Sequence, residues 1–181
     1  SMKLFFTMAL TLFLNLPAPL LQAEPAGLVR SGEGEIRYLG IFRIYSAELF
    51  VEEGVELNMV LDHQTSRCLK IHYTVEISAD DLVKGADSIL RRQYPQEYLR
   101  RVQHLIDRLH AAYGDIADGD SYTLCYDADT ITNTLYFNGN EVASIPSAEL
   151  GTVYFGIWLA QNRPLDAALR DDLLRRLSEV R

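Results

Sequence analysis

The sequence contains two cysteines that could form a disulfide bond. Cys68 and Cys125 each lie in a stretch of alternating apolar residues that is typical of a strand. The alternation places both thiols off the most apolar face of their strands. A cross-strand disulfide between them and two separate thiols both remain open, because the pairing depends on a Cα separation that the sequence does not contain. Two cysteines are too few for a disulfide scaffold or a Cys-rich zinc module.

Histidine and aspartate side chains could in principle bind a metal. His104 and His110 are six residues apart in a predicted helix, so they point to different faces and do not form a metal pair. Asp115, Asp118 and Asp120 lack the regular oxygen ligands and the closing Glu of a calcium loop. We interpret them as an acidic turn, and we expect neither a metal nor a cofactor.

Catalytic sequence motifs are missing from the chain. It contains no GxSxG, HExxH or CxxC motif and no Gly-rich phosphate loop. The composition excludes another class: 17 Lys and Arg against 25 Asp and Glu give a formal net charge of −8. Binding nucleic acid requires a basic surface, so we expect no nucleic-acid partner.

The first 23 residues have the layout of a secretory signal. Lys3 precedes a short apolar run over residues 4–14, and Ala23 stands at a suitable cleavage position. The run is too short for a bilayer span, and Pro17 and Pro19 interrupt its continuation, so we expect no stable membrane span after cleavage. We therefore predict an exported protein, periplasmic in a double-membraned bacterium, with Ser1 as a cloning remnant and residues 24–181 as a single domain.

The elements that must position any site alternate in type along the chain. The order is strands, two helices, strands and then helices. The predicted strands cover residues 35–39, 41–51, 67–77, 121–126, 132–137 and 140–145. The predicted helices follow Ser78, Pro95 and Ser147, and a last amphipathic helix covers residues 165–177. This order predicts an α+β fold, an antiparallel β-sheet with α-helices packed on one face.

Several short motifs, none decisive alone, recur in a characteristic order. They are residues 32–37 (GEGEIR), 42–50 (FRIYSAELF), 119–120 (GD), 138–139 (NG), 154–160 (YFGIWLA), 164–165 (PL) and 169–174 (LRDDLL). Over about residues 28–177, their order and spacing resemble the chalcone isomerase-like family, in particular its exported bacterial branch. The resemblance implies an open-faced β-sandwich, a sheet with helices over one face and a ligand cleft between the layers. The family contains chalcone isomerases, fatty-acid-binding proteins and members with no known reaction.

The isomerase chemistry implied by the resemblance is matched only in part. Tyr98 falls on the catalytic tyrosine, and Arg37 can stand for the arginine of the glycine-rich turn. Three positions that hold an asparagine and two threonines in the enzymes are Leu105, Tyr45 and Ile157 here. Because the loss of one oxyanion donor typically costs about 10²–10³ in rate, we expect no efficient chalcone cyclisation.

The fatty-acid-binding members of the family resemble this chain at two of those positions. They hold a carboxylate with an arginine from the glycine-rich turn and a tyrosine at this strand position, which implies the same role for Arg37 and Tyr45. A guanidinium and a phenol suit a carboxylate chemically. Tyr98 and Trp158 are further ligand-binding candidates. In the competing interpretation, Arg37 is a surface arginine and Tyr45 a core tyrosine with a satisfied hydroxyl.

Three functional hypotheses follow. The first is an exported, non-catalytic binder of a fatty acid or a similar small apolar carboxylate, held in a cleft between sheet and helices. The second is an isomerase or intramolecular lyase that acts on a chalcone-like enone, with Tyr98, Tyr45 and Arg37 as donors. The third is a periplasmic protein-interaction module whose cleft is filled by its own side chains, such as Trp158 or Phe155.

Overall fold

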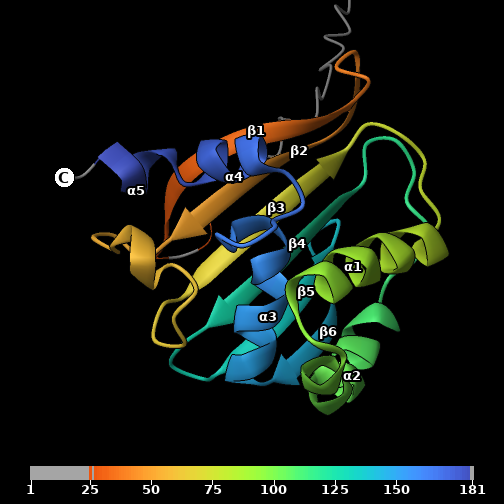
Figure 1. Cartoon of the computed structure of the whole chain (residues 1–181). Helices are drawn as coiled ribbons and strands as arrows, with labels where there is room; N and C mark the ends of the chain where they lie inside the picture. The colour runs from red at the N-terminus through yellow and green to blue at the C-terminus, as the bar shows by residue number, and fades with distance from the viewer. Residues whose placement is uncertain (1–24, 26, 180–181) are drawn as a thin grey trace, which may run out of the picture.

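Six strands form one antiparallel sheet in the computed structural model, which describes Pro25 and residues 27–179 (Figure 1). The strands are β1 (Val29–Tyr38), β2 (Phe42–Val51), β3 (Arg67–Tyr73), β4 (Ser121–Asp127), β5 (Thr132–Phe137) and β6 (Asn140–Pro146). They lie side by side in the order of the chain, and each neighbouring pair is antiparallel.

Helices cover one face of this sheet. They are α1 (Ala79–Gln93), α2 (Gln96–His110), α3 (Ala148–Leu159), α4 (Ala167–Leu173) and α5 (Arg175–Glu179), with a short 3₁₀ turn, η1 (Leu57–Met59). Figure 1 shows α3 lying against the sheet, α1 and α2 beside it, and α4 over β1 and β2. The prediction of an α+β fold with helices on one face of an antiparallel sheet is confirmed.

Serine caps begin two of the helices at the predicted places. The Ser78 hydroxyl accepts a hydrogen bond from the backbone N–H of Asp81 at 3.1 Å, and Ser147 does the same for Leu150 at 3.0 Å. Each cap satisfies one of the free N–H groups of a first helical turn. The α3 helix that Ser147 begins is apolar on all sides and almost entirely buried, as expected of a helix in the middle of the interface.

The first strand starts at Val29, earlier than the predicted residue 35. Gly32 and Gly34 weaken the strand signal of this segment, because glycine is a poor strand former. Both are required by the packing of α4. A Cβ on Gly32 would lie 2.0 Å from the Asp172 carbonyl oxygen, and one on Gly34 would lie 2.8 Å from a Leu169 methyl group. The glycines therefore mark the place where a helix approaches the strand backbone.

The last predicted helix is wrong in one respect, since residues 165–177 form two helices rather than one. The chain leaves helical geometry at Leu174, where φ is −96° and ψ is 8°, and α5 begins at the next residue. Leu169, Leu173 and Leu174 are all buried against the sheet and α3. The bend turns Leu174 toward the core. In a straight helix, Leu169, Leu173 and Leu174 could not all point toward the core equally well.

Arg67 is the most deeply buried charged side chain of the described residues. It is at the start of β3, and its guanidinium lies 4.7 Å from the Tyr126 ring centre and 4.8 Å from that of Phe155. It donates hydrogen bonds to the carbonyl oxygens of Asp62, Thr65 and Gly151 at 2.7–2.9 Å. Burial lowers the Arg67 pKa to about 10. The side chain joins a loop, the sheet and α3 at this end of the interface.

The N-terminal segment predicted to be a secretory signal, residues 1–23, lies outside the described residues. Within the part of the chain that the structure describes, no helix is long and apolar enough to cross a membrane.

Candidate functional site

A cleft of about 180 Å³ lies between the sheet and helices α1 and α3, at the end of the interface opposite Arg67. Its walls are mainly leucine, isoleucine and aromatic side chains from β2 to β5 and α3, and α1 forms part of the rim. Tyrosines supply most of the polar atoms: Tyr45, Tyr73, Tyr113, Tyr122 and Tyr154. Among the lining residues, Asp81 is the only carboxylate and there is no lysine or arginine.

Tyr45 and Trp158 meet in this cleft. The indole Nε1–H of Trp158, on α3, donates a hydrogen bond to the Tyr45 hydroxyl, on β2, at 3.2 Å. Burial raises the Tyr45 pKa to about 12, so the phenol stays protonated at neutral pH. The hydroxyl accepts from the tryptophan and donates to no side chain within the described residues. Its proton is available to a ligand oxygen.

Tyr73 supplies a second hydroxyl beside Tyr45. The two residues are cross-strand partners on β2 and β3, and their rings meet edge to face with centres 5.6 Å apart. Burial raises the Tyr73 pKa well above its usual range. Its hydroxyl has no hydrogen-bond partner among the described residues, whereas the nearby Tyr122 hydroxyl accepts from the Gly114 N–H at 2.8 Å. Tyr45 and Tyr73 therefore place two hydroxyl groups side by side in the cleft, and neither donates its proton to a described residue.

A hydrogen-bonded chain runs behind the cleft from α2 to α3. His110 Nε2 lies 3.0 Å from the Tyr154 hydroxyl, which lies 3.2 Å from the Tyr113 hydroxyl. On its other side, His110 Nδ1 is 3.8 Å from a carboxylate oxygen of Asp87. Burial lowers the His110 pKa, so the imidazole is neutral at pH 7. The chain orients Tyr113 and Tyr154 and adds no charge to the cleft wall.

Arg37 does not line the cleft. Its side chain is exposed near the tip of the β1–β2 hairpin, where Nε donates to Glu35 at 2.5 Å and Nη1 donates to the Ile41 carbonyl at 3.1 Å. The cross-strand partner of Tyr45 is Ile36, and successive strand side chains point to opposite faces. Arg37 therefore points away from the face that carries Tyr45.

Tyr98 also lies outside the lining residues. It is on α2, where its ring stacks on Tyr94 with centres 4.9 Å apart and the Arg101 guanidinium lies 5.1 Å from its centre. Partial burial and neighbouring Glu149 raise the Tyr98 pKa to about 12. Of the four ligand-binding candidates, the structure brings together Tyr45 and Trp158 and leaves Arg37 and Tyr98 elsewhere. The roles assigned to all four stay predictions.

Sequence reasoning missed most of the polar groups around the cleft. No motif assigns a site role to Tyr73, Tyr113, Tyr122, Tyr154 or His110. Their grouping depends on β3, β4, α2, α3 and the loop after α2 meeting. One signal was available. The strands place Tyr45, Tyr73 and Tyr122 near their ends and on one face, in a chain with ten tyrosines.

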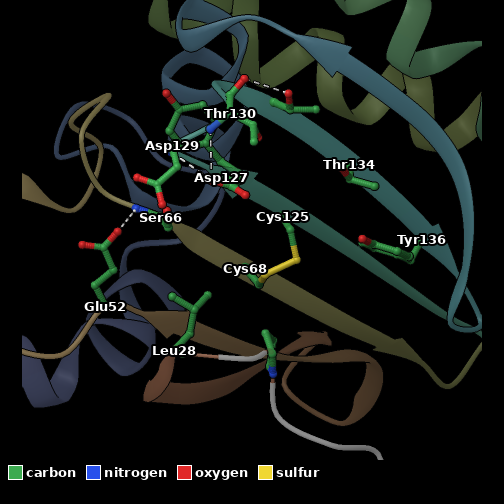
Figure 2. A pocket seen from close by; sticks show the side chains of 14 residues that line it. Leu28, Glu52, Ser66, Cys68, Cys125, Asp127, Asp129, Thr130, Thr134 and Tyr136 are labelled. Atoms are coloured by element: carbon green, nitrogen blue, oxygen red, sulfur yellow. Dashed lines mark hydrogen bonds between the residues drawn. A yellow bond between two sulfur atoms is a disulfide. The ribbon is translucent and has the colours of Figure 1, made fainter.

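The helix-free face of the sheet carries a disulfide between Cys68 and Cys125, which are cross-strand partners on β3 and β4 (Figure 2). A shallow depression of about 390 Å³ lies beside it, with Thr134 and Tyr136 on its floor. An acidic side chain at its rim is used in a local turn, since the Asp127 carboxylate accepts a hydrogen bond from the backbone N–H of Asp129 at 2.9 Å. No group of three metal-ligating side chains occurs among the described residues.

Comparisons with known proteins show which protein family and which solved structure this chain resembles. A family model described as chalcone isomerase-like matches residues 17–175. Among solved structures, a fatty-acid binding protein of Arabidopsis thaliana is similar, with a TM-score of 0.67 and 11% sequence identity. The match covers 86% of this chain and 91% of that chain. At this identity the likeness concerns the fold alone. No curated protein sequence matches the chain.

Proposed function

The chain belongs to the chalcone isomerase-like family, and from that membership we propose that it binds a small apolar ligand, with a fatty acid as the first candidate, and catalyses no reaction. The observation that carries the proposal is the apolar cleft beside Tyr45 and Tyr73. Trp158 forms one wall and leaves the volume open. An open cleft favours ligand binding over the alternative of an interaction module filled by its own side chains.

The size of the cleft limits the ligand. Its volume of about 180 Å³ is below the roughly 300–1,000 Å³ of sites for drug-sized molecules. A short or medium acyl chain, or a compound with one ring, suits this volume better than a long chain that is wholly enclosed. A longer chain would extend past Leu82 and Gly85 at the α1 rim.

The charge of the cleft selects the form of the ligand. An ionised carboxylate would find no lysine or arginine in the lining, and it would lie in the field of Asp81 and of Asp166, which acts on Tyr45. The Tyr45 and Tyr73 hydroxyls suit a neutral oxygen, such as that of an alcohol, ester, ketone or protonated acid. A fatty acid that enters this cleft is therefore expected to bind as the neutral acid.

A pH titration follows from this charge. If the cleft binds only the neutral acid, the carboxyl pKa is higher in the complex than in water, where it is about 4–5. Affinity for the acid then falls about tenfold for each pH unit above that value, since the neutral fraction falls by that factor. Calorimetry from pH 5 to pH 8 checks this, and the alcohol of equal chain length should show no such slope. An acid that binds equally at both ends of this range would show that a cation reaches its carboxylate.

The non-catalytic part of the proposal is supported by the pKa values around the cleft. General acid–base catalysis works best with a group whose pKa is near the working pH. Burial raises the pKa of both Tyr45 and Tyr113 to about 12, while the pKa of His110 is lowered and its Nε2 is engaged by Tyr154. Tyr45, Tyr113 and His110 are therefore all neutral at pH 7. Chalcone turnover above the background rate would overturn this part.

The binding test compares two neighbouring positions on α1. Ala86 lines the cleft, and Ala86→Phe should fill it and weaken binding at least tenfold in displacement of an environment-sensitive fluorescent probe. Gly85→Ala is the matched control at the cleft rim, because it adds only a methyl group that meets no atom within 4 Å. Mass spectrometry of extracts from the purified protein identifies any resident ligand. A protein that binds neither acid, alcohol nor ester, or an Ala86→Phe variant with full affinity, would contradict the proposal.

We also propose that the protein is exported. The layout of residues 1–23 supports this, and so does the Cys68–Cys125 bridge, because disulfides persist in oxidising compartments. Fractionation of the source cells, with the mass of the recovered chain, tests it. A chain that begins at Glu24 in the exported fraction is expected, and an uncut chain in the cytoplasm would contradict it.

A further inference from the structure

The tip of the β1–β2 hairpin, defined here as residues 38–42, exposes a cluster of large apolar side chains. Tyr38 is 62% exposed, Leu39 74%, Ile41 69% and Phe42 62%. They are four of the seven large exposed apolar residues of the described chain, and they stand within five consecutive positions. Single exposed apolar residues are ordinary, but a contiguous group usually marks a contact with another surface.

The backbone of this tip shows that the turn itself does not require an apolar residue. Leu39 and Gly40 have φ values of 52° and 70°, and the turn closes with a hydrogen bond from the Ile41 N–H to the Tyr38 carbonyl at 3.1 Å. Turns with two positive φ values favour Asn-Gly or Asp-Gly, whereas leucine rarely adopts positive φ. Leu39 thus occupies an unfavourable backbone position without any packing to compensate it.

A second hairpin in the same chain shows the usual solution. Asn138 and Gly139, between β5 and β6, have φ values of 48° and 82°, so this turn has the same backbone form. Its central residues and the following Asn140 are polar or lack a side chain. Since both turns close a two-stranded hairpin, the apolar residues of the β1–β2 tip serve something other than folding.

Basic side chains lie directly behind the apolar tip. Arg37 and Arg43 are cross-strand partners, and both are near Glu35, at 2.5 Å and 3.9 Å, which leaves one net positive charge at this base. Aromatic Tyr38 and Phe42 are also cross-strand partners. Aromatic and aliphatic side chains in front of arginines form the pattern that sits at the boundary between lipid headgroups and acyl chains.

The tip is at the same end of the molecule as the cleft. Phe42 precedes the cleft residue Tyr45 by three positions, and the Thr74 hydroxyl, just past β3, donates to the Arg43 carbonyl at 2.6 Å. Figure 1 shows the hairpin extending past the end of β3. We propose that this tip inserts into the surface of a lipid bilayer and docks the protein there, with the cleft entrance close to the membrane. An apolar ligand could then exchange with the bilayer without crossing much water.

Vesicle flotation of the purified protein tests the proposal without any added ligand. The Leu39→Asn and Ile41→Asn double variant copies the Asn138-Gly139-Asn140 turn into the tip, so we expect the fold to be retained while the two most exposed apolar side chains are lost. Wild-type protein is expected to float with phosphatidylcholine vesicles and more strongly with added phosphatidylglycerol. The double variant should partition at least tenfold less. Val142→Asn, which removes a 42% exposed apolar residue on β6, should stay within twofold of wild type.

The outcomes separate this proposal from ligand binding. A wild-type protein that stays with neither vesicle type, or a double variant that floats as well as wild type, overturns the proposal. A third outcome is that neither protein floats, and that the wild type dimerises in sedimentation velocity while the double variant does not. In that case the tip contacts a second copy of the chain, and the membrane assignment is wrong. Flotation without ligand binding would contradict the proposed function alone, and ligand binding without flotation would contradict only the membrane contact.

Discussion

The two ends of the helix–sheet interface differ in how they are packed: one end is filled by a buried side chain and the other contains an open cleft. At the start of β3, the Arg67 guanidinium fills the space between two aromatic rings and satisfies three backbone carbonyls. At the other end of the same strand, Tyr73 and its neighbours surround open volume. Close packing of an interior is worth several kcal/mol, so an end left open forgoes stability. The difference indicates that the filled end holds the layers together, whereas the open end is the one that we propose binds a ligand.

A pair of helical glycines shows the same contrast. At the filled end, a Cβ on Gly151 of α3 would lie 2.7 Å from the Tyr126 ring and 3.0 Å from the Asn133 side-chain oxygen. At the open end, a Cβ on Gly85 of α1 would meet nothing within 4 Å. One glycine is required by its neighbours, and the other is free to change.

Replacement of Arg67 should have the largest effect. Arg67→Ala leaves the carbonyls of Asp62, Thr65 and Gly151 without their donor and creates a cavity, so we expect a loss of about 3–5 kcal/mol in the free energy of unfolding. Urea denaturation measures it. Arg67→Lys keeps the charge but not the planar fork, and an intermediate loss is expected. A loss below about 1 kcal/mol for the alanine variant would mean that this end does not hold the layers together.

Removal of the disulfide should come next. The bridge joins residues 57 positions apart on β3 and β4, the strands that run through both ends of the interface. Replacing both cysteines with alanine should cost about 2–4 kcal/mol, mainly because the unfolded chain gains freedom. The loss is expected to be the same with and without ligand. A variant whose ligand affinity falls more than its stability would place the bridge in the construction of the open end.

Gly151→Ala should have a smaller but clear effect at the filled end. The Tyr126 ring cannot easily withdraw, since its hydroxyl donates to the His63 carbonyl at 2.8 Å and its face contacts Arg67. We expect a loss of about 1–3 kcal/mol from overpacking. Thermal denaturation measures it, with unchanged ligand affinity as the internal control. A neutral substitution would show that this end has unused room.

Gly85→Ala should have the smallest effect and the opposite sign. Alanine is a better helix former than glycine by about 0.5–1 kcal/mol, and the new methyl group has no close neighbour. A small rise in the melting temperature is expected, with binding retained. If stability falls, the α1 rim is packed more tightly than the cleft geometry indicates, and the contrast between the two ends weakens.

Much of the fold could be predicted from local pattern, and much of the site could not. The Asn138-Gly139 turn and the Ser78 cap are local signals, and the structure contains both. Arg67 follows the ordinary expectation for an exposed strand residue until two rings and a loop from distant segments enclose it. Tyr73 and Tyr154 come together only through the tertiary fold. The face of the sheet to which Arg37 points depends on the alternation of side chains along β1. The pairing of β1 with β2 shifts register after Ile36, and no short sequence motif indicates that shift.

The strands lie in the sheet in the same order as in the chain, and this order affects the folding kinetics. Four of the five strand pairings join segments separated by a single loop or turn, so they close at low entropic cost. Among the described strands, only the pairing of β3 with β4 closes a connection that contains α1 and α2, so we expect it to form late. That late step also completes the walls of the cleft. The rate-limiting barrier should therefore be sensitive to substitutions along β3 and β4 and insensitive to those in the β1–β2 hairpin.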